Sequence, residues 1–457
     1  MSSTQTKLSW KFPKAFWTAN SIELFERAAY YGAFIAMALY LTRSVGFSDI
    51  ETGWVIAIFA SLLYFMPTFM GALADRIGFR KALILAFLLL TAGYALLGAF
   101  QLKWTAIASL VLILLGGAIV KPVISGTVAK CSDDAHRARA FSIFYQIVNI
   151  GAFMGKTVAK PLRVSLGLEY INFYAATMAF VALILTLLFF KNVDHHGTGK
   201  SIKDIVKGLW HVVKNIRFMA LIIIVGGFWA IQGQIYATMP KYALRLIGES
   251  ASPEWLANIN PFIVVLFVVP ITHLVRKIRP VSSIAIGLFI IPFSALVISL
   301  SPLLEATTGQ SVQIAYGITM HPITIMMIIG IALQGLAECF LSPRFLEYAS
   351  KQAPEGEVGL YMGYSHLTTF FAWLFGFAIS GYLLNAYCPD PRTVAPDQMA
   401  AAYEHAHYIW YVFACIGVTS FVLLLIYRAV TDWVDRRHHL LIPTEGVEEP
   451  VPFVDEE

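Results

Sequence analysis

The sequence contains few charged residues and few cysteines. Only 13% of its 457 residues are Asp, Glu, Lys or Arg, whereas 58% are hydrophobic. A soluble domain carries about 25% charged residues, so this composition excludes an ordinary soluble protein. The four cysteines are scattered without C-x-x-C spacing, which excludes a disulfide framework and a cysteine-ligated metal site. No nucleotide-binding loop or nucleophile–base constellation is visible either, so we expect no enzymatic activity, no cofactor and no metal.

Long apolar runs take the place of the missing charges. The mean hydropathy is +0.69, and a helix needs about 20 apolar residues to cross the hydrocarbon core. Runs of this length predict an all-α membrane protein with twelve transmembrane helices. The predicted spans are 16–41, 51–73, 82–101, 105–128, 139–160, 170–190, 218–246, 255–275, 282–301, 319–350, 358–386 and 405–430.

One long polar break divides these spans into six and six. It predicts an N-terminal six-helix bundle over 1–190, a cytoplasmic linker over 191–217, a C-terminal six-helix bundle over 218–430 and a cytoplasmic tail over 431–457. The linker places apolar residues at helical spacing between lysines, which is typical of an amphipathic helix on an anionic membrane surface. Two six-helix halves that rock about a central site are an architecture of transporters.

The cations concentrate in alternate loops. If both termini are cytoplasmic, 23 Lys and Arg residues lie inside and eight outside, the bias typical of a multi-pass protein of the cell membrane. The net charge of +5 therefore indicates a bilayer as partner and not a nucleic acid. No A-x-A-like cleavage site follows the first span, so we expect that span to be retained.

The first span contains charges in the stretch "ELFERAAYYG", residues 23–32. Glu23, Glu26, Arg27 and Tyr30 fall on one helical stripe, with Tyr31 beside it. Each charge at the bilayer centre would cost about 2.5–3.5 kcal/mol, so the stripe should line a wet cavity or form a structural ion-pair cluster.

The fourth span holds a second unusual cation. Lys121 lies in an apolar run directly before Pro122, where the helix is locally weakened. It needs a carboxylate, and the glutamates of the first span are the obvious partners. Two acids and two cations form a balanced set, in which protonation of an acid releases a cation for an anionic ligand.

The segment "GALADRIGFRK", residues 71–81, resembles the signature of the major facilitator superfamily between helices 2 and 3. Its small glycines permit close helix approach, and its aspartate can accept hydrogen bonds from a helix N-terminus. The resemblance implies a gate in this turn; the alternative is a generic cationic turn. The gating residues it implies are Gly71, Asp75, Arg76 and Gly78.

Further motifs narrow the resemblance. The stripe matches E-x-x-E-R-x-x-Y-Y-G, the helix 1 signature of the proton-dependent oligopeptide transporter family, at every defined position. "KPVIS" at 121–125 and "FSIFYQIVNIGAF" at 141–153 are similar to its helix 4 and helix 5 segments, and "AECFLSP" at 337–343 resembles its helix 10 pattern.

This resemblance implies the roles of individual residues. The proton-coupling residues would be Glu23, Glu26, Arg27 and Lys121. The substrate-binding residues would be Arg27, Tyr30, Tyr31, Tyr64, Lys121, Asn149 and Glu338, with the cations receiving a peptide carboxylate and Glu338 its amino group. We add Lys156, which lies on the face of Asn149 where the family usually has proline, although it could also be a lysine that reaches the outer interface.

The sequence departs from the family at one further pair. The bacterial carriers have a second helix 1 arginine and a helix 7 glutamate, and here these positions are Phe34 and Gly233. We expect a monomeric proton-coupled symporter that imports di- or tripeptides, or a related small zwitterionic or anionic metabolite, by alternating access. The alternative is an exporter or exchanger of a non-peptide compound on the same fold.

Overall fold

The computed structural model describes residues 12–132, 137–191, 202–315, 317–352 and 363–437. Parts of the predicted linker (192–201) and tail (438–457) lie outside these ranges, as do residues 358–362 of the eleventh predicted span. The model is almost entirely helical. Beyond the helices, the described residues contain one short hairpin between two antiparallel strands.

The described residues of the first half of the chain form seven helices, two of which share one predicted span. The bounds are α1 Lys14–Arg43, α2 Asp49–Phe65, α3 Pro67–Ile77, α4 Phe79–Ala99, α5 Lys103–Lys130, α6 Arg137–Ser165 and α7 Leu168–Phe189. Between α2 and α3 the axis bends by 50°, because Pro67 has no N–H to continue the helical ladder. The predicted span 51–73 is therefore broken in two. The linker contains α8, Ile202–Lys214.

The second half is more irregular. Its membrane helices and their interruptions are α9 Ile216–Gln232, α10 Gln234–Ala237, α11 Met239–Leu246, α12 Pro253–Leu256, α13 Ile259–Leu274, α14 Pro280–Ser299, α15 Ser301–Thr308, α16 Pro322–Lys351, α18 Leu367–Tyr387, α19 Met399–Tyr403 and α20 Tyr408–Arg437. The short elements between them are β1 Val312–Ala315, β2 Ile318–Met320, η1 Pro391–Thr393 and η2 Pro396–Gln398. The helix α20 thus continues into the residues we expected to begin the tail.

Nine segments of the described residues are long and apolar enough to cross a membrane, or ten if the bent α2–α3 pair is one span. The other two predicted spans correspond to α1 and α6, which are 30 and 29 residues long. Both contain charged and polar residues along their length, which lowers their hydropathy. The twelve predicted spans are consistent with this arrangement.

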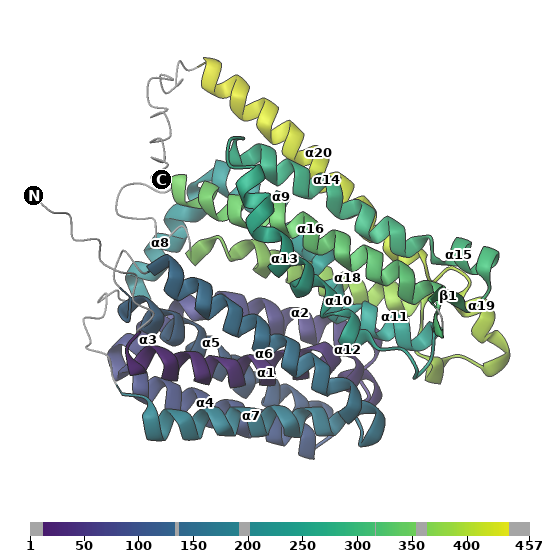
Figure 1. Ribbon diagram of the computed structural model, residues 1–457, viewed down its shortest axis with the longest axis horizontal. Coiled ribbons are helices and arrows are strands. Elements are labelled where there is room, and N and C mark those ends of the chain that lie inside the picture. Colours follow the sequence, from purple (N-terminus) through teal and green to yellow (C-terminus); the bar gives the residue numbers. More distant parts are fainter. Residues whose placement is uncertain (1–11, 133–136, 192–201, 316, 353–362, 438–457) are drawn as a thin grey trace, which may run out of the picture.

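The two halves of the chain lie side by side. Figure 1 shows α1 to α7 in one half of the molecule and α9 to α20 in the other, with α8 at the left end of the view. Glycines bring helices of different halves together: a Cβ at Gly53 of α2 would lie 3.0 Å from the Cα of Gly381 on α18. Because such contact needs hydrogen in place of a side chain, these glycines position the interface between the halves.

The halves are joined most extensively at the end remote from α8, which we call the closed end. Here α1 ends at Arg43, and α11 and α12 cross toward the first half. Arg43 pairs with Glu249, and Lys241 with Asp49. The Trp255 indole donates to the Thr157 carbonyl oxygen over 3.2 Å.

Candidate functional site

The charged stripe of α1 is buried in the first half. Glu23, Glu26 and Arg27 are each at most 5% exposed. The Arg27 Nε lies 3.0 Å from a Glu23 carboxylate oxygen and forms a second, closer ion pair with Glu26. Gly151 and Gly155 of α6 let that helix pack closely on this part of α1, since a Cβ at Gly151 would lie 2.8 Å from the Arg27 Cβ. One guanidinium therefore forms ion pairs with two carboxylates and neutralises part of their combined charge.

Lys121 of α5 lies beside this cluster, but among the described residues no carboxylate is within ion-pair distance of it, because Glu23 and Glu26 both pair with Arg27. The predicted direct pair between Lys121 and a glutamate is therefore not formed. The Lys121 Nζ lies 4.0 Å from the centre of the Tyr64 ring, at a distance where the ring face attracts a cation. A small pocket of about 10 Å³ separates Lys121 from Glu26, Arg27 and Tyr30. This volume holds about one water molecule, so the pocket can connect these groups by hydrogen bonds through water.

A larger cavity of about 380 Å³ lies between the two halves. Its size falls in the range of small-molecule sites. Aromatic and polar side chains from α1, α2, α6, α9, α10, α13, α16 and α18 form its wall. The lining residues are Tyr31, Tyr64, Tyr145, Val148, Asn149, Ala152, Lys156, Trp229, Gln232, Tyr236, Asn260, Pro261, Val264, Glu338, Ser342, Phe345, Leu346, Ser365, His366, Thr368, Thr369 and Trp373.

Opposite charges face this cavity from opposite halves. Glu338 of α16 accepts a hydrogen bond of 3.2 Å from the Asn260 amide. Lys156 of α6 is 1% exposed, and its Nζ donates to the Ala257 carbonyl oxygen over 3.0 Å. Asn149 donates to the Tyr145 carbonyl oxygen of its own helix over 2.8 Å, which leaves its side-chain oxygen as an acceptor.

The structure thus divides the predicted site residues between two adjoining spaces. Four of them line the small pocket, namely Glu26, Arg27, Tyr30 and Lys121. Five line the large cavity, namely Tyr31, Tyr64, Asn149, Lys156 and Glu338. Glu23 lines neither but is bound to Arg27. Tyr64 joins the two spaces, since it contacts Lys121 and faces the cavity.

The predicted gating residues lie at the end of the first half near α8. A Cβ at Gly71 would lie 3.3 Å from the Pro122 ring, so this glycine allows α3 to approach α5 directly beside Lys121. Gly78 has a φ of 93°, which favours glycine and turns the chain from α3 into α4. Asp75 is partly buried and Arg76 is exposed.

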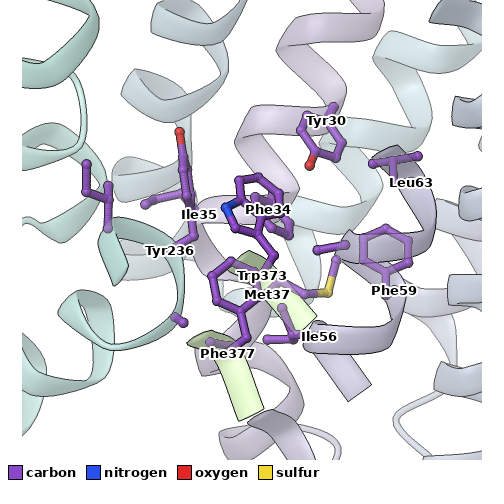
Figure 2. Packing of buried hydrophobic residues seen from close by; sticks show 14 of the residues in the cluster. Tyr30, Phe34, Ile35, Met37, Ile56, Phe59, Leu63, Tyr236, Trp373 and Phe377 are labelled. Atoms are coloured by element: carbon purple, nitrogen blue, oxygen red, sulfur yellow. The ribbon is translucent and has the colours of Figure 1, made fainter. Parts of the chain in front are cut away.

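Phe34 and Gly233 belong to an aromatic cluster that joins the halves. Figure 2 shows Phe34 of α1 among Tyr236, Trp373 and Phe377, and its ring centre lies 5.0 Å from that of Tyr236 and 5.7 Å from that of Trp373. A Cβ at Gly233 would lie 2.8 Å from the Phe377 ring and 3.0 Å from the Trp373 Nε1. Aromatic rings therefore occupy the space that a longer side chain at position 233 would need.

Sequence reasoning missed a buried ion network at the closed end. Asp49 begins α2, is 3% exposed, and accepts hydrogen bonds from Lys241 over 2.8 Å and from Arg245 over 2.9 Å. Arg163 of α6 binds Glu254 of α12 at 2.5 Å. The partners are about 90 or 190 positions apart in the chain, so no local pattern pairs them. The available signal was a pair of cations, Lys241 and Arg245, within the predicted span 218–246.

A second missed group lies in the segment between α18 and α20. The Arg392 guanidinium and backbone N–H both donate to Asp390. Burial alone would raise the pKa of Asp390, but these hydrogen bonds lower it to about 2. Arg392 also donates to the Thr42 carbonyl oxygen over 2.6 Å, which ties this segment to the end of α1.

Among the described residues, no group of His, Cys, Asp and Glu side chains could hold a metal ion.

The fold and the buried charges define a membrane transporter built from two helical halves, and comparison with known proteins assigns the family. The model of the Major Facilitator Superfamily matches residues 21–316 and 306–454. The chain belongs to this superfamily.

Within the superfamily, the resemblance to proton-dependent oligopeptide transporters is confirmed. The chain is 24% identical to dipeptide and tripeptide permease A of Citrobacter koseri, over 91% of each chain. It is 29% identical to the same permease of Serratia proteamaculans, over 52% of this chain and 47% of that one. In the latter match, the chain spans about half the length of its relative.

Solved structures of the oligopeptide transporter family share the fold. A family member in complex with a thioalcohol-conjugated peptide has a TM-score of 0.73 at 19% identity, over 92% of this chain and 97% of that one. A member in complex with 5-aminolevulinic acid has a TM-score of 0.69 at 19% identity, over 91% and 97%. The predicted major facilitator fold is therefore confirmed.

Proposed function

We propose that this protein is a proton-coupled symporter that carries small peptides, or a related small zwitterionic or anionic metabolite, by alternating access. In this proposal it is a monomer in the plasma membrane with both termini in the cytoplasm. Protons are the coupling ion, there is no cofactor, and no chemical reaction is catalysed. The observation that carries the proposal is the buried cluster of Glu23, Glu26 and Arg27 beside a cavity of opposite charges. The names of the similar permeases support a peptide as substrate.

Proton uptake is assigned to the two glutamates of α1. Both hold Arg27 while they are ionised. Protonation of Glu26 removes one of these charges, so the guanidinium becomes available to an anionic group of the substrate. Arg27 and Lys121 line the same small pocket, so in this proposal both cations would bind the same anionic group of the substrate. Glu338, on the facing half, would hold the amino group of the substrate.

Alternating access would follow from the contacts between the halves. With the termini inside, the closed end faces the exterior, and the ion pairs of Asp49 and Arg163 close it. The turn at Gly71 and Asp75 would control the opposite, cytoplasmic end. One charge that crosses 100 mV gains about 2.3 kcal/mol, so one proton can sustain a substrate gradient of order tens-fold.

The test is Glu26→Gln in proteoliposomes. We expect it to abolish accumulation of a labelled dipeptide driven by a proton gradient, while counterflow exchange continues. Glu51→Gln is the matched control, because Glu51 is exposed on α2 and caps that helix, a position that glutamine also fits. Concentrative uptake by Glu26→Gln under a proton gradient would show that the proton site is assigned wrongly.

One observation favours a second function, an exporter or exchanger of a non-peptide compound. The aromatic cluster of Phe34, Tyr236 and Trp373 replaces a charged pair beside the cavity, which changes what the site can bind. A thermal-shift screen of purified protein with dipeptides, amino acids and organic anions separates the two functions. Stabilisation by organic anions, with none by any di- or tripeptide, would favour the second function over peptide uptake.

A further inference from the structure

Lys156 is a buried cation that the proton switch does not use. It lines the large cavity, and within the described part of the chain no carboxylate lies within ion-pair distance of it. Among the described residues its Nζ donates to one acceptor, the neutral Ala257 carbonyl, and lies 5.7 Å from the centre of the Tyr31 ring. An ammonium group has three donors, so two remain for a ligand. A buried charge without a counter-charge is costly, so an anionic group in the cavity would stabilise this position.

Lys156 is well separated from Arg27. Gly151 packs against Arg27, and Lys156 follows Gly151 by five residues on the same helix. At 1.5 Å per residue this is about 7.5 Å along the axis of α6, toward the closed end. The two cations also face different spaces, the small pocket and the large cavity. Because the two cations line different spaces, we assign them to two different anionic groups of one substrate.

The formal charges around the site also favour a substrate that carries two anionic groups. The small pocket, the cavity and the bound Glu23 together contain three carboxylates and three cations, with His366 counted as neutral. These six groups are Glu23, Glu26, Glu338, Arg27, Lys121 and Lys156. One proton on a carboxylate leaves one excess positive charge in a buried site. A zwitterion preserves that excess, whereas a substrate with a net charge of −1 cancels it.

We propose that Lys156 binds a second anionic group of the substrate and that the preferred substrates are small peptides with one acidic side chain. The inference rests on the proposed function, in which Arg27 and Lys121 bind the main-chain carboxylate and Glu338 binds the amino group. Lys156 then binds the side-chain carboxylate in the part of the cavity nearest the closed end. Uptake of such a peptide with one proton moves no net charge.

The experiment compares Ala-Glu with Ala-Gln, which have nearly the same shape and differ by one charge. Full-length protein in liposomes is driven by a proton gradient, and the membrane potential is set with valinomycin and potassium. We expect kcat/KM to favour Ala-Glu by about tenfold, which corresponds to about 1.4 kcal/mol. Ala-Glu uptake should not respond to the potential, whereas a negative interior should accelerate Ala-Gln uptake.

Two variants test the role of the side chain. Lys156→Gln should reduce the ratio of kcat/KM for Ala-Glu to that for Ala-Gln to about one, and Lys156→Arg should retain the preference for Ala-Glu. The matched control is Lys160→Gln: Lys160 lies one turn further along α6, contacts Ser252 and the Trp255 ring, and should not alter the preference. A purely structural Lys156 would lower thermal stability and leave the ratio unchanged, which would overturn the proposal.

The outcomes separate this inference from the function on which it rests. Proton-driven uptake of Ala-Gln without a preference for Ala-Glu overturns the assignment of Lys156 and leaves peptide symport intact. Uptake of neither peptide overturns both. Potential-dependent uptake of Ala-Glu by the unmodified protein contradicts the charge balance, and this result does not depend on whether any variant folds.

Discussion

Asp49→Asn should open the closed end. Asp49 accepts hydrogen bonds from Lys241 at 2.8 Å and from two Arg245 nitrogens at 2.9 Å each. The substitution leaves Arg245 with Asp390 at 3.9 Å. It leaves Lys241, which is 1% exposed, with no carboxylate within ion-pair distance among the described residues. Removing one partner of a buried ion pair costs about 3–5 kcal/mol.

Most of this cost falls on the closed conformation, because opening lets water hydrate the two cations. At 1.4 kcal/mol per tenfold change, 3 kcal/mol shifts the equilibrium toward the open conformation by about a hundredfold. An exposed pair provides the contrast: Arg43 and Glu249 lie 2.5 Å apart with side chains 32% and 64% exposed. Such a pair contributes about 1 kcal/mol at most, so Arg43→Gln should change the equilibrium less than about tenfold.

The reporter is Cys388, which is buried at the closed end and whose carbonyl accepts a hydrogen bond from Arg245. With Cys388 as the only cysteine, a membrane-impermeant maleimide added outside measures opening by its rate of labelling. We expect Asp49→Asn to accelerate labelling strongly. The double variant Asp49→Asn/Lys241→Met should be labelled more slowly than Asp49→Asn alone. Labelling of Asp49→Asn within about twofold of the parent rate would refute this account of the closed end.

Three further predictions concern stability, measured by thermal unfolding in detergent. Gly233→Ala places a Cβ 2.8 Å from the Phe377 ring and should lower stability by about 1–3 kcal/mol; Gly363→Ala, whose Cβ meets nothing within 4 Å, should not. Gly155→Ala drives a Cβ into the Ala28 carbonyl oxygen, so we expect little folded protein. Asp390 has a pKa lowered to about 2 from an ordinary 3.8. The stabilisation of the fold by its ionised carboxylate is therefore complete above pH 3.8 and is lost as the pH falls toward 2. The stability difference between Asp390→Asn and the parent should shrink over that interval, and a constant difference would contradict the assignment.

The fold was largely predictable because apolar length is a direct physical signal. Twelve runs predicted the spans, and the superfamily fold is confirmed. The break at Pro67 was not predicted, since proline within an apolar run can either kink a helix or end it. The irregular path through α10, α11 and α12 was missed for a similar reason: these short helices contain the same apolar residues as a continuous span.

From residue spacing alone, the candidate site was predictable only where its residues share one helix; Tyr64, Asn149 and Glu338 were predicted from the family resemblance. Helical spacing alone places Glu23, Glu26 and Arg27 together, and the structure places them within ion-pair distance. Partners on distant helices left no local pattern. The Asn260 amide beside Glu338 and the cations around Asp49 became visible only once the halves were packed together.

Phe34 and Gly233 show how the two kinds of information combine. The sequence showed that a cation and an anion were absent together, which avoids an unpaired buried charge but does not say what fills the space. The structure places Phe34 against Trp373 and Tyr236, and leaves no room for a Cβ at position 233. Aromatic contacts therefore join the halves where an ion pair would otherwise do so, and these contacts do not depend on protonation. With that pair gone, the charged groups that the described residues place beside the cavity and the small pocket are those of the α1 cluster, Lys121, Glu338 and Lys156, and these are the groups to which we assign proton and substrate binding in our proposal.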